Sequence, residues 1–398
     1  MTDQPPTQRL DRLETYLRQD PENLSLLGDT FEAALQAGEW ARAEFHLRHA
    51  KALGAEPRRW QLREAHWLIA QHRWDEAESC LRQLMSAQGA PAAERFVLAH
   101  DLAYVALRRG SFEAGFAELA PWVENVAASE ALDPAHQALW LRLLHHLRRF
   151  ESAFEWATAR WQLQQLAPAA AGVASLIALD VDQASCAMEW AEYALRHDGQ
   201  QPEALVARAT LALGQNDAAL ARRLVTQALL RNPSDGRTLS ALGFTDLLEL
   251  QLDAARANFQ QAVQSMPGHI GTWHGLGWTR LLQGDLLAAR QAFDTALALD
   301  RNFGESHGGL AVVQAMLNQR AEAEQSIERA LRLDRAGMSA HYAQAVLRGE
   351  ARDMQAIRRL ARRLLGGRAA LMGSDMLDVL QRAVPTMKDY GTEGSSEP

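Results

Sequence analysis

Cysteine is nearly absent from this chain of 398 residues, which contains only Cys80 and Cys186. Two cysteines so far apart in sequence form neither a disulfide framework nor a zinc knuckle. We expect both to be small, buried, apolar residues of a protein from a reducing compartment. No run of about 18 apolar residues is present. Residues 1–25 lack the cationic start and apolar core of a secretory signal. The predicted location is the cytoplasm, without a transmembrane segment.

Positive charge is also in short supply. The chain has 41 Lys and Arg against 49 Asp and Glu, which gives a formal net charge of −8. Nucleic-acid binding depends on clustered Lys and Arg that neutralise phosphates. The acidic balance therefore argues against a general nucleic-acid binder, although local basic patches remain open. With 47% hydrophobic and 23% charged residues, the composition is typical of a soluble globular protein.

Recognisable catalytic motifs are missing as well. The glycines of 271–277 fall inside a helical pattern and do not follow a strand, so they do not form a phosphate-binding loop. The pairs His46/His49 and His145/His146 lack a third or fourth metal ligand at a regular spacing. There is no Gly-x-Ser-x-Gly motif, and neither cysteine has a neighbouring histidine to activate it. The sequence predicts no enzyme, no metal site, no cofactor and no small-molecule substrate.

What is present is a repeat with a period of 34 residues. Residues 271–302, moved along the chain by 34, align position by position with the stretch that follows. The same register gives nine units over 24–337, with insertions of four residues at 92–95 and 130–133. Each unit contains two apolar-periodic segments around a turn, so each is predicted to be a helical hairpin. One hairpin cannot bury both of its faces, and the units are expected to stack into a solenoid.

The twentieth position of the unit never carries a side chain larger than a methyl group. A close crossing of two antiparallel helices explains this restriction, because a longer side chain would push the backbones apart. Positions 20, 24 and 27 are spaced by four and three residues, which places them on one helical face. The occupants of position 20 are Ala43, Ala77, Gly115, Ala153, Ala187, Ala221, Ala255, Ala289 and Ala323.

This pattern resembles that of the tetratricopeptide-repeat family over about four fifths of the chain. The residues that match it most completely are Trp273, Leu276, Gly277, Ala289, Phe293 and Ala296. The resemblance implies an all-α fold, namely a right-handed superhelical solenoid of about nine hairpins with helical caps. It also implies that the protein binds other proteins or peptides.

The units fall into two blocks. Position 17 is aromatic in the first four units and in none of the later ones; its aromatic occupants are Trp40, Trp74, Phe112 and Phe150. We therefore expect an N-terminal capping helix in 1–23, a degenerate block in 24–167 and a well-matched block in 168–337. A C-terminal helical cap is expected in 338–386, followed by a disordered tail in 387–398.

Two hairpins of the first block depart from the pattern. Pro121 lies inside the second helix of its unit, and Trp122 and Arg160 replace the usual alanine at position 27. A proline removes a helical hydrogen bond, and the large side chains need room that alanine does not. These two hairpins are predicted to pack less regularly than the others.

In tetratricopeptide repeats the first helix of each hairpin lines the inner, concave face. In the second block this face carries large apolar side chains, which would suit an amphipathic helix or an apolar peptide of a partner. Some of these positions are partly covered by neighbouring hairpins, so a place in the core is the competing interpretation. Arg237 and His274 are expected to set the polarity of the groove. The candidate binding residues are Arg237, Phe244, Leu248, His274, Trp278, Leu282, Val312 and Met316.

Two further surfaces remain open to more than one interpretation. The inner face of the first block is more polar and weakly cationic, which fits an acidic partner or a simply solvated surface. Its polar residues are His66, His100, Tyr104, Arg108, Arg142, His145 and His146. In the predicted cap, the helix expected at 353–366 interleaves arginine with leucine. That helix fits the end of the last repeat, but it could also touch a membrane or nucleic acid.

The leading hypothesis is a cytoplasmic adaptor, scaffold or chaperone-like protein that holds an apolar segment of a partner in the groove of 202–337. The alternative is a structural or assembly subunit of a bacterial secretion or envelope-polymer machine that uses its convex surface. RNA binding through the basic C-terminal helix is a third hypothesis, which the acidic total disfavours. The oligomeric state is left open.

Overall fold

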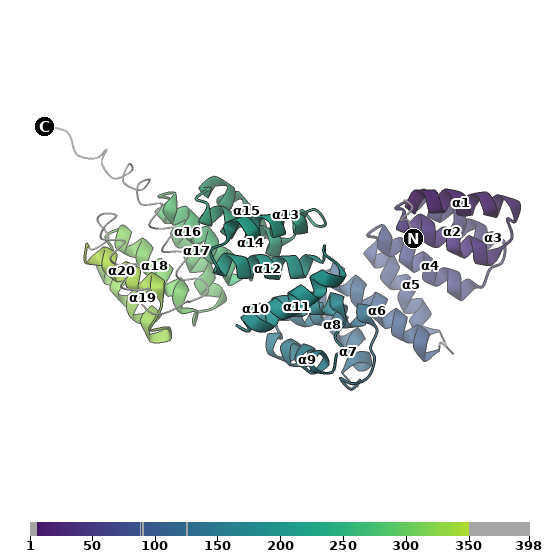
Figure 1. Cartoon of the computed structure of the whole chain (residues 1–398), viewed down its shortest axis with the longest axis horizontal. Helices are drawn as coiled ribbons and strands as arrows, with labels where there is room; N and C mark the ends of the chain where they lie inside the picture. Colours follow the sequence, from purple (N-terminus) through teal and green to yellow (C-terminus); the bar gives the residue numbers. More distant parts are fainter. Residues whose placement is uncertain (1–5, 88, 90, 125, 350–398) are drawn as a thin grey trace. The chain divides into compact units, whose positions relative to one another are not determined.

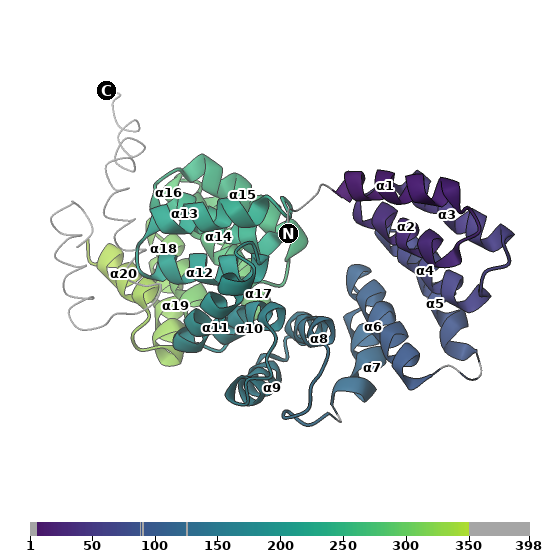
Figure 2. The same ribbon diagram turned by 45° about the vertical axis from the view of Figure 1, so that its right-hand side comes forward.

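The computed structural model describes residues 6–349 except 88, 90 and 125. Within these residues the chain forms twenty helices and no strand, so the predicted all-α fold is confirmed. The chain divides between Ala170 and Ala171 into two compact units. Figures 1 and 2 show the helices of each unit in chain order.

The first unit contains nine helices and the beginning of a tenth. Their bounds are α1 (Pro6–Gln19), α2 (Leu24–Gln36), α3 (Trp40–Ala52), α4 (Pro57–Ala70), α5 (Trp74–Ser86), α6 (Ala92–Arg108), α7 (Phe112–Val123), α8 (Pro134–His146), α9 (Phe150–Gln162) and α10 (Pro168–Asp180). The four aromatic residues of position 17 are the first residues of α3, α5, α7 and α9. The period of the sequence thus predicts where the second helix of each hairpin begins.

The second unit takes most of α10 and continues the alternation. Its further helices are α11 (Ala184–His197), α12 (Pro202–Gly214), α13 (Ala218–Leu229), α14 (Gly236–Leu248), α15 (Leu252–Ser265), α16 (Ile270–Leu282), α17 (Leu286–Leu299), α18 (Gly304–Met316), α19 (Arg320–Leu333) and α20 (Met338–Leu347). Helices α2 to α19 form nine successive pairs, in agreement with nine hairpins, and α1 and α20 stand at the two ends. The helices expected at 353–366 and 373–384 and the tail at 387–398 lie outside the described residues. The right-handed superhelix stays a prediction.

The steric restriction at position 20 is present in the structure. All eight alanines at this position are fully buried. At the ninth, a Cβ added to Gly115 would lie 2.8 Å from Cδ2 of Leu143 and 3.1 Å from the carbonyl oxygen of Ala103. Position 20 is therefore small because the neighbouring helices leave no room for a longer side chain.

Position 8 obeys the same rule through an aromatic partner. A Cβ added to Gly243 or to Gly277 would lie 2.8 Å from a ring carbon of Phe259 or Phe293, respectively. Each phenylalanine occupies position 24 of the same hairpin, and both rings are fully buried. The two helices of these hairpins pack by setting a phenyl ring over a bare glycine backbone.

Each hairpin turns through one residue in the left-handed backbone conformation, and this residue always occupies position 15. Three of the nine are glycines, with φ between 72° and 80°. The non-glycine residues, with φ between 57° and 60°, are His72, Arg148, Asp182, Asn216, Leu250 and Asn318. Glycine and asparagine accept this conformation readily, whereas leucine and arginine do so at a cost. The turn is thus imposed by the packing of the hairpin, even where the residue does not favour it.

Three passages between helical hairpins in the second unit share a side-chain contact. In each, the ring nitrogen at position 4 contacts the carbonyl oxygen of the residue six places earlier, in the preceding turn. The nitrogen–oxygen distance is 2.8 Å from Trp273 to Pro267 and 3.0 Å from His307 to Arg301. His341 repeats the contact at the start of α20. This contact satisfies a turn carbonyl and orients the following helix.

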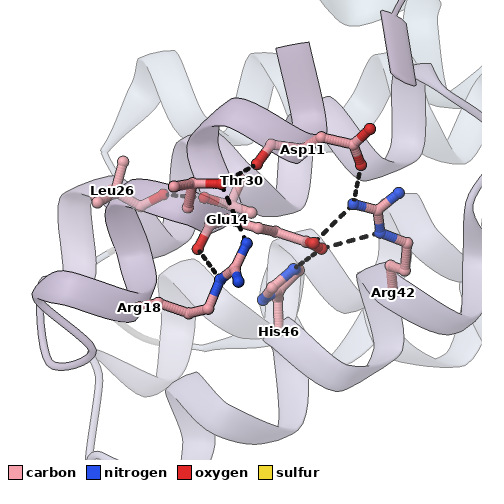
Figure 3. Close-up of polar contacts among 8 residues, drawn as sticks. Asp11, Glu14, Arg18, Leu26, Thr30, Arg42 and His46 are labelled. Carbon is pink, nitrogen blue, oxygen red and sulfur yellow. Dashed lines mark hydrogen bonds and ion pairs between the residues drawn. The ribbon is translucent and has the colours of Figure 1, made fainter. Parts of the chain in front are cut away.

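An ionic network fastens α1 to the first hairpin. In Figures 1 and 2, α1 covers α2 and α3 at the end of the first unit. The guanidinium of Arg42 on α3 donates to the carboxylates of Asp11 and Glu14 at 2.6 Å each, and Nε2 of His46 lies 3.0 Å from Glu14 (Figure 3). The hydrogen bond from Arg42 holds the pKa of Glu14 below its usual value. The lone helix is thus attached by paired charges as well as by apolar packing.

The irregular hairpins of the first unit pack around a buried arginine. Helix α7, which contains Pro121, ends at Val123, and ten residues separate it from α8. The guanidinium of Arg160, whose residue is only 1% exposed, donates at 3.1–3.5 Å to carbonyl oxygens of this connection. The acceptors belong to Val126, Ala127, Ala128 and Glu130. The departure at position 27 therefore supplies the donors that the irregular connection needs.

Candidate partner-binding surface

The first helices of the second unit pack against one another in sequence. Helix α14 contacts α12 and α16, and α18 contacts α16 and α20. We call the surface formed by α12, α14, α16, α18 and α20 the first-helix row. Helices α18 and α20 approach closely at Gly308, where an added Cβ would lie 2.6 Å from Cβ of Ser339. The row is therefore tightly packed at its α18–α20 end.

Four of the eight predicted binding residues lie in the core of the row. Trp278 is 3% exposed and Val312 is 0% exposed, and Leu248 and Leu282 are also buried. The indole of Trp278 packs edge to face on Phe293, with 6.0 Å between ring centroids. Neighbouring helices cover these positions, so the structure assigns them to packing and not to an open groove. Their predicted role as partner anchors is not carried into the proposal below.

Two predicted anchors remain at the surface. Phe244 on α14 and Met316 on α18 are half-buried. The ring of Phe244 packs edge to face on Phe259 with 4.9 Å between centroids, which fixes its orientation. Both side chains are partly exposed to solvent and partly packed against the protein. A residue that binds an apolar group of a partner needs both properties.

Arg237 is held within the row by an internal ion pair. Its guanidinium lies 2.6 Å from the carboxylate of Asp180 on α10, and both side chains are largely shielded from water. Partial burial strengthens such a pair relative to an exposed one. The predicted role of Arg237 in setting groove polarity is therefore limited, because its charge is compensated inside the protein.

His274 is held neutral among aromatic rings. Its ring centroid lies 5.2 Å from that of Phe293 and 5.5 Å from that of Phe303. Burial lowers the pKa of His274 to about 4, and the backbone of Glu305 opposes this shift. The buried nitrogen Nε2 has no hydrogen-bond partner within the part of the chain that the structure describes. At neutral pH this residue adds a polar edge but no charge to the row.

The low pKa of His274 predicts a loss of stability in mild acid. Between pH 6.5 and 4 the His274 ring is protonated in the unfolded chain but stays neutral in the folded chain. The free energy of unfolding therefore falls by at most about 1.4 kcal/mol for each pH unit by which the pH is lowered. Urea unfolding of the wild type and of His274→Phe at pH 7, 6 and 5 measures this effect. The wild type should lose stability relative to the variant as pH falls. A difference that stays constant between pH 7 and 5 would contradict the prediction.

The row also contains a half-buried carboxylate that the sequence pattern did not predict as a site residue. Glu305 on α18 accepts a hydrogen bond from the hydroxyl of Ser339 on α20. Burial raises the pKa of Glu305, although the hydrogen bond from Ser339 opposes the shift. The repeat register relates the two residues, because both occupy position 2 of their units. The prediction of a cap at 338–348 does not extend the row to Ser339.

The first unit is less cationic on its inner side than the sequence suggested. The carboxylate of Asp101, which is largely buried, lies 2.8 Å from Nε2 of His66 and 3.1 Å from Nδ1 of His100. Burial opposes the charged form of Asp101, but the two histidine hydrogen bonds outweigh it and lower its pKa. The same hydrogen bond and charge overcome the effect of burial on His66 and raise its pKa. The expected weakly cationic stretch thus contains its own counter-charge.

Two other kinds of site were sought in the described residues. No three His, Cys, Asp or Glu side chains of this part of the chain are grouped so that they could hold a metal ion. Among the helices α1 to α20, none has both the length and the apolarity needed to cross a membrane.

Comparisons with known proteins bear on the fold. No protein-family model and no curated protein sequence matches the chain. A solved structure of the human IFIT1 dimer with m7Gppp-AAAA matches at 15% identity and a TM-score of 0.50, covering 95% of this chain and 94% of that one. A monomeric mutant of IFIT1 with Gppp-AAAA also matches at 15% identity and a TM-score of 0.50, covering 95% of each chain. YrrB, a tetratricopeptide-repeat protein with an unusual peptide-binding site, matches at 17% identity and a TM-score of 0.34, over 49% of this chain and 97% of its own.

The IFIT1 structures and the nine helix pairs define the class of fold. The chain is a helical-repeat solenoid of the tetratricopeptide type, and the resemblance predicted from its sequence is confirmed. At 15% identity the likeness to IFIT1 concerns the fold alone. The nucleotide ligands named in the IFIT1 structures belong to IFIT1, and they give no support to the expectation that nucleic acid is an unlikely partner of this chain.

Proposed function

We propose that the chain is a non-enzymatic scaffold that binds an apolar segment of another protein on the first-helix row. The observation that carries the proposal is the pair Phe244 and Met316, two large apolar side chains on the first-helix row that are only half-buried. Aromatic and methionine side chains with this degree of exposure are favourable anchors, because a partner can complete their burial. The row then offers separate contact points on α14 and α18 in place of one deep groove.

The electrostatics of the row support an apolar partner. Arg237 is paired with Asp180, and His274 is neutral at pH 7. Glu305 is hydrogen-bonded to Ser339 and its pKa is raised. With these charges compensated or suppressed, a charged partner segment would gain little on this surface and would lose its hydration.

The proposal is tested by removing the two anchors together. A photo-reactive amino acid is placed at Thr210 on α12, a half-buried residue at the same repeat position as Phe244, and crosslinked partners are identified in cells by mass spectrometry. The double variant Phe244→Ala/Met316→Ala should reduce the recovered partner by about tenfold, since two buried apolar contacts are lost. The matched control is Leu230→Ala/Leu287→Ala, which removes two side chains that are 75% and 69% exposed away from the row. Equal recovery from the anchor variant and the control contradicts the proposal.

Two other functions are outcomes of the same experiment. Crosslinks confined to copies of this chain, together with stable oligomers by light scattering, would favour the structural or assembly subunit. The IFIT1 structures with m7Gppp-AAAA and Gppp-AAAA make RNA the second candidate ligand. A crosslinked RNA whose recovery falls steeply with salt would favour RNA binding.

A further inference from the structure

A shallow depression of about 630 Å³ lies on the second unit, and none of its lining residues is proposed above to bind a partner. We call it the α17–α19 depression, because most of its lining comes from the C-terminal parts of these two helices and the turn after α17. It is lined by Asp294, Leu297, Ala298, Arg301, His307, Arg329, Arg332 and Leu333.

The lining carries an excess of positive charge. Three guanidinium groups face one carboxylate, that of Asp294, which lies 3.7 Å from Arg290. Arg332 forms an exposed pair with Glu328, and such pairs contribute little. Arg301 and Arg329 have no ion-pair partner among the residues that the structure describes. In a chain with a net charge of −8, this excess is a local exception.

Ordinary helix chemistry explains only part of this charge. A basic residue in the last turn of a helix interacts favourably with the helix dipole, and Arg332 has that place in α19. Arg329 precedes the last turn, and Arg301 follows the end of α17. The backbone of Arg301 is also fixed, because its carbonyl oxygen lies 3.0 Å from Nε2 of His307. The exposed side chain of Arg301 therefore extends from a turn whose backbone is held in place by His307.

The depression is apolar as well as basic. Leu333 is 44% exposed, Leu297 is partly exposed, and Ala298 lies at the surface between them in the lining. A surface for phosphates alone would have no need of leucine side chains. Guanidinium groups bind carboxylates in a two-pronged geometry, and nearby leucines bury apolar groups of the same ligand. The combination fits an acidic segment of a protein that also carries apolar side chains.

We propose that the α17–α19 depression binds an acidic, leucine-bearing segment of a partner protein, independently of the first-helix row. Arg301 and Arg329 bind the carboxylates, and Leu297 and Leu333 bury the apolar side chains. With both surfaces occupied, the protein connects two partners. The proposal does not rest on the proposed function, because none of its lining residues belongs to the row's contact points.

The test measures binding of a fluorescent peptide to the full chain by anisotropy. The probe contains glutamates and leucines, with the leucines three and four residues apart so that they share a helical face. Arg301→Glu/Arg329→Glu should weaken binding by about tenfold or more, because both carboxylate contacts become repulsive. The matched control Arg223→Glu/Arg256→Glu reverses two charges on α13 and α15 of the same unit and should change affinity by less than about threefold.

Further probes separate the proposal from its rivals. A peptide of equal charge with serine in place of leucine should bind at least about tenfold more weakly, because the apolar contacts are lost. Equal binding of the serine peptide would overturn the apolar part of the site. Equal losses in the two double variants would show only long-range attraction and would overturn the site. Absence of binding by the leucine peptide, or tighter binding of an oligoadenylate at the same residues, would also overturn the proposal.

Discussion

Replacing Arg160 with alanine should destabilise the first unit by about 1–3 kcal/mol. The substitution removes a buried guanidinium that donates to carbonyl oxygens of the connection after α7, and each carbonyl that water does not reach is left unsatisfied. Hydrogen exchange followed by mass spectrometry measures the effect best, because a repeat array need not unfold in one step. Exchange should accelerate most in 126–130 and in the adjoining α8 and α9.

The controls for this prediction are two other arginine variants. Arg149→Ala removes an exposed guanidinium that lies 4.3 Å from the ring centroid of Phe116, and should cost at most about 1 kcal/mol. Arg160→Lys keeps the positive charge but lacks the planar set of N–H donors of arginine. It should therefore recover little of the stability that Arg160→Ala loses. Unchanged exchange in 126–130 after Arg160→Ala would show that the guanidinium does not organise this connection.

The second large effect is expected from Ala289→Leu. Ala289 is fully buried at the crossing of α16 and α17, and overpacking of such a site costs about 1–3 kcal/mol or more when the backbone must move. Circular dichroism against urea should show a lower unfolding midpoint for the second unit. Ala321→Leu, at an exposed position of α19, is the matched control and should be close to neutral. Equal midpoints for the two variants would refute the steric account of position 20.

The sequence predicts the hairpins well because their boundaries depend on local rules that repeat. The small residue at position 20 and the aromatic start of α3 or α5 are visible without coordinates. The backbone conformation of the turn residue at position 15 is less well predicted by the conformational preference of the residue that occupies it. Gly284 and Asn318 favour the left-handed conformation, whereas Leu250 adopts it only because the packed helices on either side require it.

The candidate site was predicted less completely, for a physical reason. A repeat pattern identifies the face on which Trp278 lies, but not how closely the neighbouring first helices approach over it. That distance depends on side chains from other hairpins, such as Ser339 against Gly308. For the same reason the charge compensation of Arg237 by Asp180, separated by 57 positions in sequence, was not predicted. Burial and ion pairing between repeats arise from packing that no single unit encodes.

The Arg237–Asp180 pair has a mechanical consequence. In a solenoid most contacts join adjacent repeats, so a pulling force can lengthen the array through small changes in the angle between neighbouring repeats. This pair joins α14 to α10 past the intervening hairpin, and it must break before that stretch of the array can extend. The segment from α10 to α14 should therefore be the stiffest part of the second unit under tension, and stretching should begin in the repeats that follow it.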